Sequence, residues 1–302
     1  MDQLLAIRAF ARVVEAGTFT KAADSLQMPN ATVTKLIQSL ETHVGVKLLQ
    51  RTTRRVTVTP DGAAYYEKTA RILKDLGDVD TSFGTAQSTP RGHLRVDTGS
   101  SLASLVIIPA LPEFLQRYPD IQLDLGVSDR HVNLISDNVD CVIRGGTLMD
   151  ESLVGRQIGK AAWVTCATPG YLQQFGVPTH PQQLQQPHQH RIVNYLSART
   201  GRVVPMPFAK GAERLEITGR HAVGINESNA HLAAGLAGLG IIHTFAYTGR
   251  SHIASGALVP ILQDWAAPPY PFHVAYPPNR HMSNRLRVFI DWIAARFETM
   301  AA

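Results

Sequence analysis

Apolar residues in the first 44 positions recur at intervals of three and four, which is the spacing of one buried face on an α-helix. Three such runs follow one another along the chain. Their apolar positions are Leu4, Ile7, Phe10, Ala11 and Val14, then Ala22, Ala23 and Leu26, and finally Val33, Leu36, Ile37, Leu40 and Val44. The pattern predicts three consecutive amphipathic helices.

The residues between these runs are typical of helix ends. Gly17 suits the left-handed conformation that ends many helices, and Thr18 can cap the helix that follows. Pro29 blocks continuation of the second helix, and Asn30 is expected to cap the third. Helix, tight turn and helix in this order predict a helix-turn-helix unit, whose second helix enters the major groove of DNA.

The polar face of the third helix differs from an ordinary solvated face, which interleaves Glu with Lys. It carries Thr32, Thr34, Lys35 and Gln38, and its first carboxylate is Glu41. Hydroxyl and amide groups match the donors, acceptors and methyl groups of base edges, whereas carboxylates are repelled by phosphate. This face therefore predicts contact with DNA.

The segment RTTRRVTVTPDG at residues 51–62 predicts a β-hairpin wing. Arg51, Arg54 and Arg55 would place cations at its tip, where they can neutralise phosphates or enter a minor groove, and a turn is expected at 60–62. A structural helical bundle that carries a basic hairpin is the alternative interpretation.

No proline interrupts residues 61–85, and one apolar seam runs through them. Its positions are Tyr65, Thr69, Ile72, Leu76, Val79 and Phe83, a heptad-like spacing. The seam can pair with a second copy of the chain or pack on the protein's own core. Small and turn residues at 86–92 predict a hinge after this helix.

Beyond residue 92, short apolar runs alternate with helical stretches, which predicts an α/β fold with mainly parallel sheets. The expected strands and helices lie within residues 93–99, 101–118, 121–127, 140–146, 161–172, 191–196, 229–245 and 272–297.

Composition and charge narrow the function. The 302 residues are 44% hydrophobic and 18% charged, which excludes a disordered chain. The net charge is +5, and +4 of it falls in residues 1–60, as expected for a basic nucleic-acid-binding module on a near-neutral body. Two cysteines, no signal peptide and no membrane-length apolar run favour a soluble cytoplasmic protein.

Residues 19–62 resemble the winged helix-turn-helix of LysR-type transcriptional regulators. The features in register are the Ala22–Ala23 pair, the Leu40–Glu41 pair, Gly-Val-Lys-Leu-Leu at 45–49, Arg51, and Thr-Pro-Asp-Gly at 59–62. The resemblance implies promoter DNA as partner, with contacts from Thr18, Asn30, Ala31, Thr32, Thr34, Lys35, Gln38, Arg51, Arg54 and Arg55. It also implies homodimers that assemble into homotetramers.

The same resemblance implies three parts. These are a DNA-binding domain at 1–62, a dimerising linker helix and hinge at 63–91, and a two-lobed effector domain at 92–302 similar to periplasmic solute-binding proteins. Lobe I would comprise 92–163 and 267–302, and lobe II would comprise 164–266, with crossings near 162–166 and 265–269.

A cleft between two α/β lobes is a natural site for a small molecule. The helix start at Ser100 and Ser101 offers free amides and hydroxyls to an anion, and Arg144 follows a strand. We therefore expect an organic acid or aromatic metabolite, bound by Thr98, Ser100, Ser101, Ser128, Arg144, Asn226 and His243. The alternatives are that the serines only cap the helix and that Arg144 pairs with an aspartate of the protein.

No catalytic motif is present, and GLAGLG at 235–240 lacks the spacing of a nucleotide-binding loop. The pair His188 and His190 lacks the Cys or acidic company of a metal site. We therefore expect no enzymatic activity, cofactor or metal. A solute-binding module or an enzyme built on the two-lobed fold are the rival functions.

Overall fold

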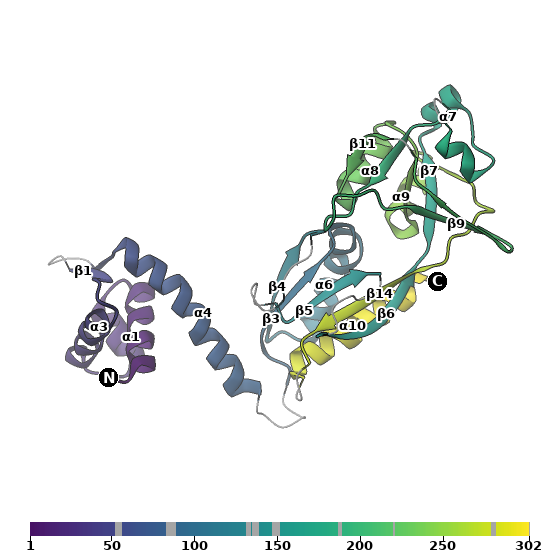
Figure 1. The fold of residues 1–302 in the computed structure, drawn as a ribbon. Helices are drawn as coiled ribbons and strands as arrows, with labels where there is room; N and C mark the ends of the chain where they lie inside the picture. Colours follow the sequence, from purple (N-terminus) through teal and green to yellow (C-terminus); the bar gives the residue numbers. More distant parts are fainter. Residues whose placement is uncertain are drawn as a thin grey trace. The chain divides into compact units, whose positions relative to one another are not determined.

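The computed structural model describes residues 1–51, 56–82, 89–130, 134, 139–146, 152–186, 189–219, 221–278 and 282–301. The chain divides into two compact units, Met1–Thr85 and Ala86–Ala302 (Figure 1). None of the helices in the described part of the chain combines the length and hydropathy that a bilayer crossing requires.

The N-terminal unit is a helix-turn-helix followed by a hairpin and a long helix. Its elements are α1 (Gln3–Ala16), α2 (Phe19–Leu26), α3 (Asn30–Val44), β1 (Leu49–Arg51), β2 (Val56–Val58) and α4 (Pro60–Ser82). The strands β1 and β2 pair antiparallel, as expected for the wing. Phe10, Val33 and Ile37 lie in the buried core that holds α1 to α3 together.

Two predicted boundaries of α1 and α2 are confirmed. Gly17 ends α1 with φ of 70° and donates its N–H to the carbonyl of Val13. The Thr18 side chain caps α2 by accepting a hydrogen bond from the Lys21 N–H at 3.2 Å.

The prediction that Asn30 caps α3 is wrong. The cap residue is Pro29, whose carbonyl accepts from the N–H groups of Thr32 and Val33 at 2.9 and 3.2 Å. Asn30 is already the first helical residue, and its side chain donates to the Thr20 hydroxyl at 3.3 Å. It therefore links α3 to α2 instead of capping α3.

The prediction of a turn at residues 60–62 is also wrong, because α4 begins at Pro60. Proline suits a first helical position, where its missing N–H costs nothing. The Thr59 hydroxyl accepts from the Gly62 N–H at 2.9 Å, and a Cβ at Gly62 would lie 2.0 Å from the Leu48 carbonyl oxygen. Thr59-Pro-Asp-Gly is therefore a helix start packed against the wing.

The seam along α4 is divided between two environments. Thr69 is buried and the Tyr65 ring packs on Phe10, with ring centroids 5.8 Å apart, so this part covers the core of its own unit. Ile72, one turn further, is 58% exposed. The side chains of Val79 and Phe83 lie outside the described residues.

The first lobe of the C-terminal unit contains a five-stranded sheet in the order β4-β3-β5-β14-β6. The strands are β3 (Gly92–Thr98), β4 (Ile121–Val127), β5 (Cys141–Gly145), β6 (Val154–Ala161) and β14 (Tyr270–Tyr276). β3 is parallel to β4 and β5, whereas β14 is antiparallel to β5 and β6. A continuous helical run, α5 (Ser100–Leu102), the π-helical η1 (Ala103–Ile107) and α6 (Ile108–Arg117), joins β3 to β4. The C-terminal helix α10 (Asn284–Ala301) packs against β6 (Figure 1).

The second lobe contains smaller sheets. Its elements are β7 (Trp163–Ala167), α7 (Pro169–Phe175), η2 (Pro181–Gln185), β8 (Ile192–Tyr195), β9 (Met206–Lys210), β10 (Glu213–Ile217), β11 (His221–Ile225), α8 (Ser228–Leu236), β12 (Ile242–Phe245), α9 (Ala246–Ala254) and β13 (Val259–Ile261). The pair β8 and β11 is parallel, but β12 and β13 flank β7 antiparallel and β9 pairs antiparallel with β10. The expectation of mainly parallel sheets is therefore wrong for the described strands, because two of the four pairings in the first lobe are antiparallel and most pairings in the second lobe are antiparallel as well.

The chain passes between the large sheet and the sheets of the second lobe at two places. β6 ends at Ala161 in the first sheet and β7 starts at Trp163 in the second lobe. The return path lies between the end of β13 at Ile261 and the start of β14 at Tyr270. Residues at both passages line the cavity described below.

Candidate DNA interface and effector cavity

The polar face of α3 is presented to solvent in the N-terminal unit. Thr32, Lys35 and Gln38 are exposed, as are Asn30 and Ala31 at the start of the helix, and Thr34 is half-buried. The packing that holds α3 leaves this face uncovered within its own unit, as expected for a helix that contacts a partner.

Glu41, the carboxylate in this helix, is turned away from that face and is buried. It accepts hydrogen bonds from the Leu48 and Leu49 amides at 3.0 and 3.2 Å and from Lys47 Nζ at 2.7 Å. Burial acts to raise the pKa of Glu41, but these hydrogen bonds and the Lys47 charge outweigh it and hold the pKa below its ordinary value. Glu41 thus ties α3 to the first strand of the wing.

The predicted wing cations are only partly described. Arg51 ends β1, although its side chain lies outside the described residues. Arg54 and Arg55 also lie outside them.

A cavity of about 500 Å³ lies between the two lobes of the C-terminal unit. Aromatic rings from both lobes form much of its wall. Trp163 stacks on Phe245 with ring centroids 4.3 Å apart, and Tyr270 packs on Phe245 at 5.6 Å. Such a wall suits a flat, apolar ligand.

His243 lines this cavity in the neutral state. Its Nδ1 lies 2.9 Å from the Thr165 hydroxyl, and its ring stacks on Trp163 at 4.9 Å. Burial, and to a lesser extent the neighbouring His231, lower the pKa of His243 to about 3. Among the described residues, no group pairs with His243 Nε2 or with Trp163 Nε1, and both atoms are buried.

The structure brings three of the predicted effector residues to the cavity, Ser101, Arg144 and His243. The others lie outside the lining that the described residues form. Thr98 is fully buried, Ser100 is buried, Ser128 accepts a hydrogen bond from the Arg130 N–H, and Asn226 is exposed. Local strand and helix ends predicted the neighbourhood but not which side chains face inward.

Arg144 pairs with an aspartate of the protein, which was the alternative left open by the sequence. Its guanidinium donates to the Asp97 carboxylate, and also to the carbonyls of Ile143 and Arg130 at 3.0 and 3.1 Å. The guanidinium is therefore engaged by acceptors of the chain itself.

The amides at the Ser100 helix start are not free, contrary to our expectation. Asp129, which follows β4, accepts from the Ser100 N–H at 2.8 Å through Oδ1. Its Oδ2 accepts from the Ser228 N–H at 2.5 Å and from the Tyr195 hydroxyl at 3.1 Å. The Ser101 N–H donates to the Ser228 hydroxyl at 2.9 Å.

Asp129 and the aromatic wall were not predicted from the sequence. Asp129 is adjacent to Ser128, so the end of β4 indicated the right place but the wrong side chain. Trp163 and Tyr270 are the first residues of the strands that follow the two passages between the lobes. Their positions next to the predicted crossings could have indicated that they line the cavity.

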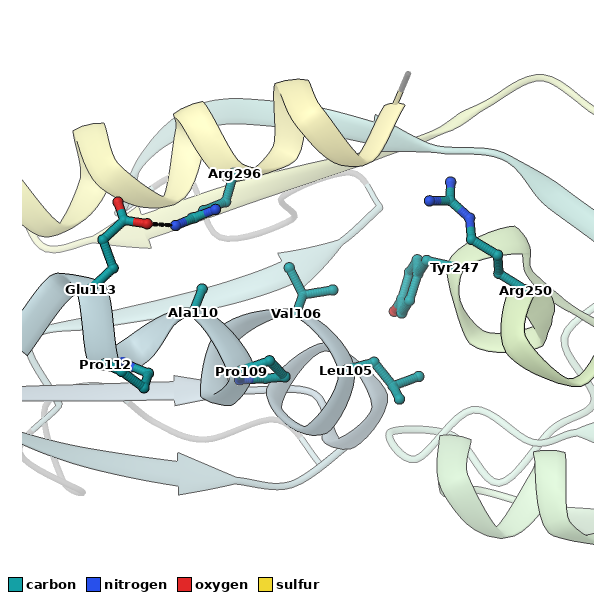
Figure 2. Close-up of a pocket in the computed structure, with 9 residues that line it drawn as sticks. All are labelled: Leu105, Val106, Pro109, Ala110, Pro112, Glu113, Tyr247, Arg250 and Arg296. Carbon is teal, nitrogen blue, oxygen red and sulfur yellow. Dashed lines mark hydrogen bonds and ion pairs between the residues drawn. The ribbon is translucent and has the colours of Figure 1, made fainter. Parts of the chain in front are cut away.

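A second pocket lies where η1, α6 and α10 of the first lobe meet α9 of the second lobe (Figure 2). It is formed by α6, by Tyr247 and Arg250 of α9, and by Arg296 of α10, which pairs with Glu113. Tyr247 also lines the cavity between the lobes, where its hydroxyl lies 3.0 Å from the Ser101 hydroxyl. Most residues that line the second pocket are exposed, so it would enclose a ligand poorly. We therefore take the cavity between the lobes as the candidate effector site.

Comparison with known proteins agrees with this architecture. Residues 4–63 match the bacterial regulatory helix-turn-helix of the LysR family, and residues 87–298 match the LysR substrate binding domain. An HTH-type transcriptional repressor from Pseudomonas aeruginosa is 37% identical, over 98% of this chain and 93% of the relative.

Two solved structures cover almost the whole chain. The LysR-type transcriptional regulator CrgA from Neisseria meningitidis has a TM-score of 0.62 and 29% identity, over 97% of this chain and 98% of CrgA. The full-length Vibrio cholerae virulence activator AphB has a TM-score of 0.61 and 27% identity, with the same coverage. The winged helix-turn-helix and the two-lobed domain thus occur in one chain in these proteins as well. This chain belongs to the LysR family of transcriptional regulators.

Proposed function

We propose that this LysR-type regulator binds promoter DNA through α3 and the wing. The observation that carries this proposal is the exposed, carboxylate-free face of α3, with Glu41 turned inward. The proposed base and backbone contacts are Thr18, Asn30, Ala31, Thr32, Thr34, Lys35 and Gln38, with Arg51, Arg54 and Arg55 on phosphates or in a minor groove. Because DNA is its partner, we place it in the cytoplasm.

Each of the three parts predicted from the sequence has its own function in this proposal. We assign DNA binding to residues 1–62, dimerisation to 63–91 and effector binding to 92–302. Within the last part, lobe I comprises 92–163 and 267–302, and lobe II comprises 164–266.

The effector is a small molecule held in the cavity between the lobes. The aromatic wall of Trp163, Phe245 and Tyr270 supports an aromatic compound. Binding shifts DNA affinity only in so far as the effector prefers one arrangement of the assembly to another.

Exposed apolar side chains support the assembly of dimers into tetramers. Ile72 lies on α4, where the seam leaves its own core. Leu105, Ile108 and Leu115 are 43%, 49% and 40% exposed along the run from η1 to α6. We propose that the first patch holds dimers and the second joins effector domains.

A selection experiment tests this function. Full-length protein is used to enrich duplexes from a random DNA pool, and the winning duplex is then titrated with full-length protein and with residues 92–302 alone. We expect the full chain to enrich one sequence and the shorter chain to bind it no better than random DNA. Equal binding by residues 92–302 would contradict the assignment.

The salt dependence of the same titration gives a second test. Because residues 1–60 carry a net charge of +4, the full chain should lose affinity steeply as salt rises. If the selection from the random DNA pool enriches no sequence, the solute-binding or enzymatic alternative is favoured.

A further inference from the structure

The meeting point of the two lobes has the features of an anion site. Ser100 begins the helical run that continues to Arg117, and Ser228 begins α8. Their N–H groups both point to one place, and the Tyr195 hydroxyl is a third donor there. Helix N-termini and free amides stabilise a negative charge at such a position.

The chain fills this position with its own carboxylate, Asp129. One carboxylate oxygen accepts a hydrogen bond from the Ser100 amide of lobe I. The other accepts hydrogen bonds from the Ser228 amide and the Tyr195 hydroxyl of lobe II. Asp129 therefore satisfies the donors that a bound acid would use, and it also links the lobes.

The fit around Asp129 is close. A Cβ on Gly99 would lie 3.0 Å from Asp129 Oδ1, so the glycine leaves room for the carboxylate. Burial, and next the Asp129 charge, raise the pKa of Tyr195, which keeps its hydroxyl protonated as a donor.

The surroundings leave little for a second anion. Glu227 accepts from the next amides of α8, those of Asn229 and Ala230, at 3.0 and 2.7 Å. Arg144, a cation in the cavity lining, is engaged by Asp97. The first two amides of the Ser100 helix and the first three of α8 already donate to acceptors of the chain, so an acidic ligand would meet the negative charge of Asp129 without those donors.

The rest of the cavity suits an uncharged ligand. Its wall is aromatic, and His243 is neutral. Two buried polar atoms, His243 Nε2 and Trp163 Nε1, have no partner among the described residues. A neutral hydrogen-bonding group on an aromatic ring would satisfy either of them.

We propose that Asp129 is a built-in occupant of the carboxylate position, so that this regulator responds to an uncharged aromatic effector and not to an aromatic acid. This revises the organic-acid class expected from the sequence. It rests on the proposed function, because it concerns the effector cavity of that regulator.

Chemical rescue of the full-length protein tests the proposal. Asp129→Ala removes the carboxylate and should lower the thermal unfolding midpoint of the effector domain. Acetate and benzoate should raise that midpoint by at least about 2–4 °C, and the rise should saturate with concentration. In a domain of this size, such a shift corresponds to an increase of about 1 kcal/mol in the free energy of unfolding. Acetamide, which has the shape of acetate without the charge, should not restore it, and benzamide should raise the midpoint by less than benzoate does.

Two further variants separate the carboxylate position from general effects. Asp129→Asn keeps the position filled, so it should be destabilised but not rescued. Asp264→Ala removes an exposed aspartate paired with Lys210 and should show no response specific to carboxylates. A carboxylate effect of equal size in Asp264→Ala and Asp129→Ala, or no preference for carboxylates in Asp129→Ala, would overturn the proposal.

Wild-type protein decides the matter even if Asp129→Ala does not fold. Wild type should be stabilised by benzamide at least as well as by benzoate, whereas stronger stabilisation by benzoate would overturn the proposal. Binding of the selected duplex is measured in parallel. Wild type that fails to bind DNA contradicts the proposed function, whereas DNA binding together with stronger stabilisation of wild type by benzoate than by benzamide contradicts only the inference about Asp129.

Discussion

Glu41 has a structural role in α3, whereas exposed residues of the same helix are the ones that we expect to contact DNA. From the sequence it is the first carboxylate on the polar face of α3, but its oxygens bind the Leu48 and Leu49 amides and Lys47. The exposed positions Lys35 and Gln38 retain the face that matches DNA. The helical period alone did not show this difference, because Glu41 bonds with residues seven and eight positions further along the chain.

His243 gives a prediction at the residue scale about pH. Its folded pKa of about 3 lies below the value of about 6.5 in an unfolded chain, so between these values the unfolded state binds a proton that the folded state does not. The free energy of unfolding should therefore fall as pH drops from 6.5 towards 4, by up to about 1.4 kcal/mol per pH unit for this group. His243→Gln should show a shallower dependence.

Urea unfolding followed by tryptophan fluorescence measures this effect, since Trp163, Trp265 and Trp292 all lie in the C-terminal unit. His43→Gln is the control, because His43 lies in the other unit and should leave the slope unchanged. Buried His231, whose pKa is also lowered by burial, should sustain part of the slope in both variants. Identical slopes in wild type and His243→Gln would contradict this account.

At the scale of elements, local patterns predicted most of the helices and the first strands of the large sheet. The predicted strands at 93–99, 121–127 and 140–146 correspond to β3, β4 and β5. β6 was missed because it is largely exposed and lacks a regular alternation of apolar and polar residues. The pair β9 and β10 was also missed, and with it the antiparallel character of the second lobe.

Contacts between distant elements account for the remaining differences in the effector cavity. The Arg144–Asp97 pair spans 47 positions, and the Asp129–Ser228 hydrogen bond spans 99. Whether a strand-end side chain binds a ligand or another part of the chain depends on such contacts, and these are not visible as a local pattern.

The seam of α4 gives a prediction at the element scale. Ile72→Asp places a charge where 58% of an apolar side chain is exposed in the single chain and where we expect a partner helix. If wild type forms the proposed tetramer, the variant should sediment at half that mass at micromolar concentration, since the proposed effector-domain contacts would still join pairs of chains.

Val177→Asp is the matched control, because Val177 is 59% exposed and lies in the second lobe, which contributes residues to neither proposed interface. This variant should keep the wild-type mass. A wild-type monomer, or an Ile72→Asp variant with unchanged mass, would show that α4 does not hold the assembly.

At the scale of the whole molecule, we assign recognition of the DNA sequence to α3 and effector binding to the other compact unit. Removing Lys35 and Gln38 together should therefore sharply reduce the preference among DNA sequences while leaving the effector domain intact. A lost base contact costs about 1–3 kcal/mol, roughly a factor of 5 to 150 in affinity. Binding to random DNA should change much less, because most of it comes from phosphate contacts elsewhere.

The most direct measurement is the ratio of affinities for the selected duplex and a shuffled duplex, obtained by fluorescence anisotropy at one fixed salt concentration. We predict that Lys35→Ala/Gln38→Ala lowers this ratio at least about 10-fold. The control Lys160→Ala/Gln174→Ala, which makes the same changes at exposed positions of the effector domain, should retain the wild-type ratio. An unchanged ratio in Lys35→Ala/Gln38→Ala, or an equal loss in the control, would contradict the account.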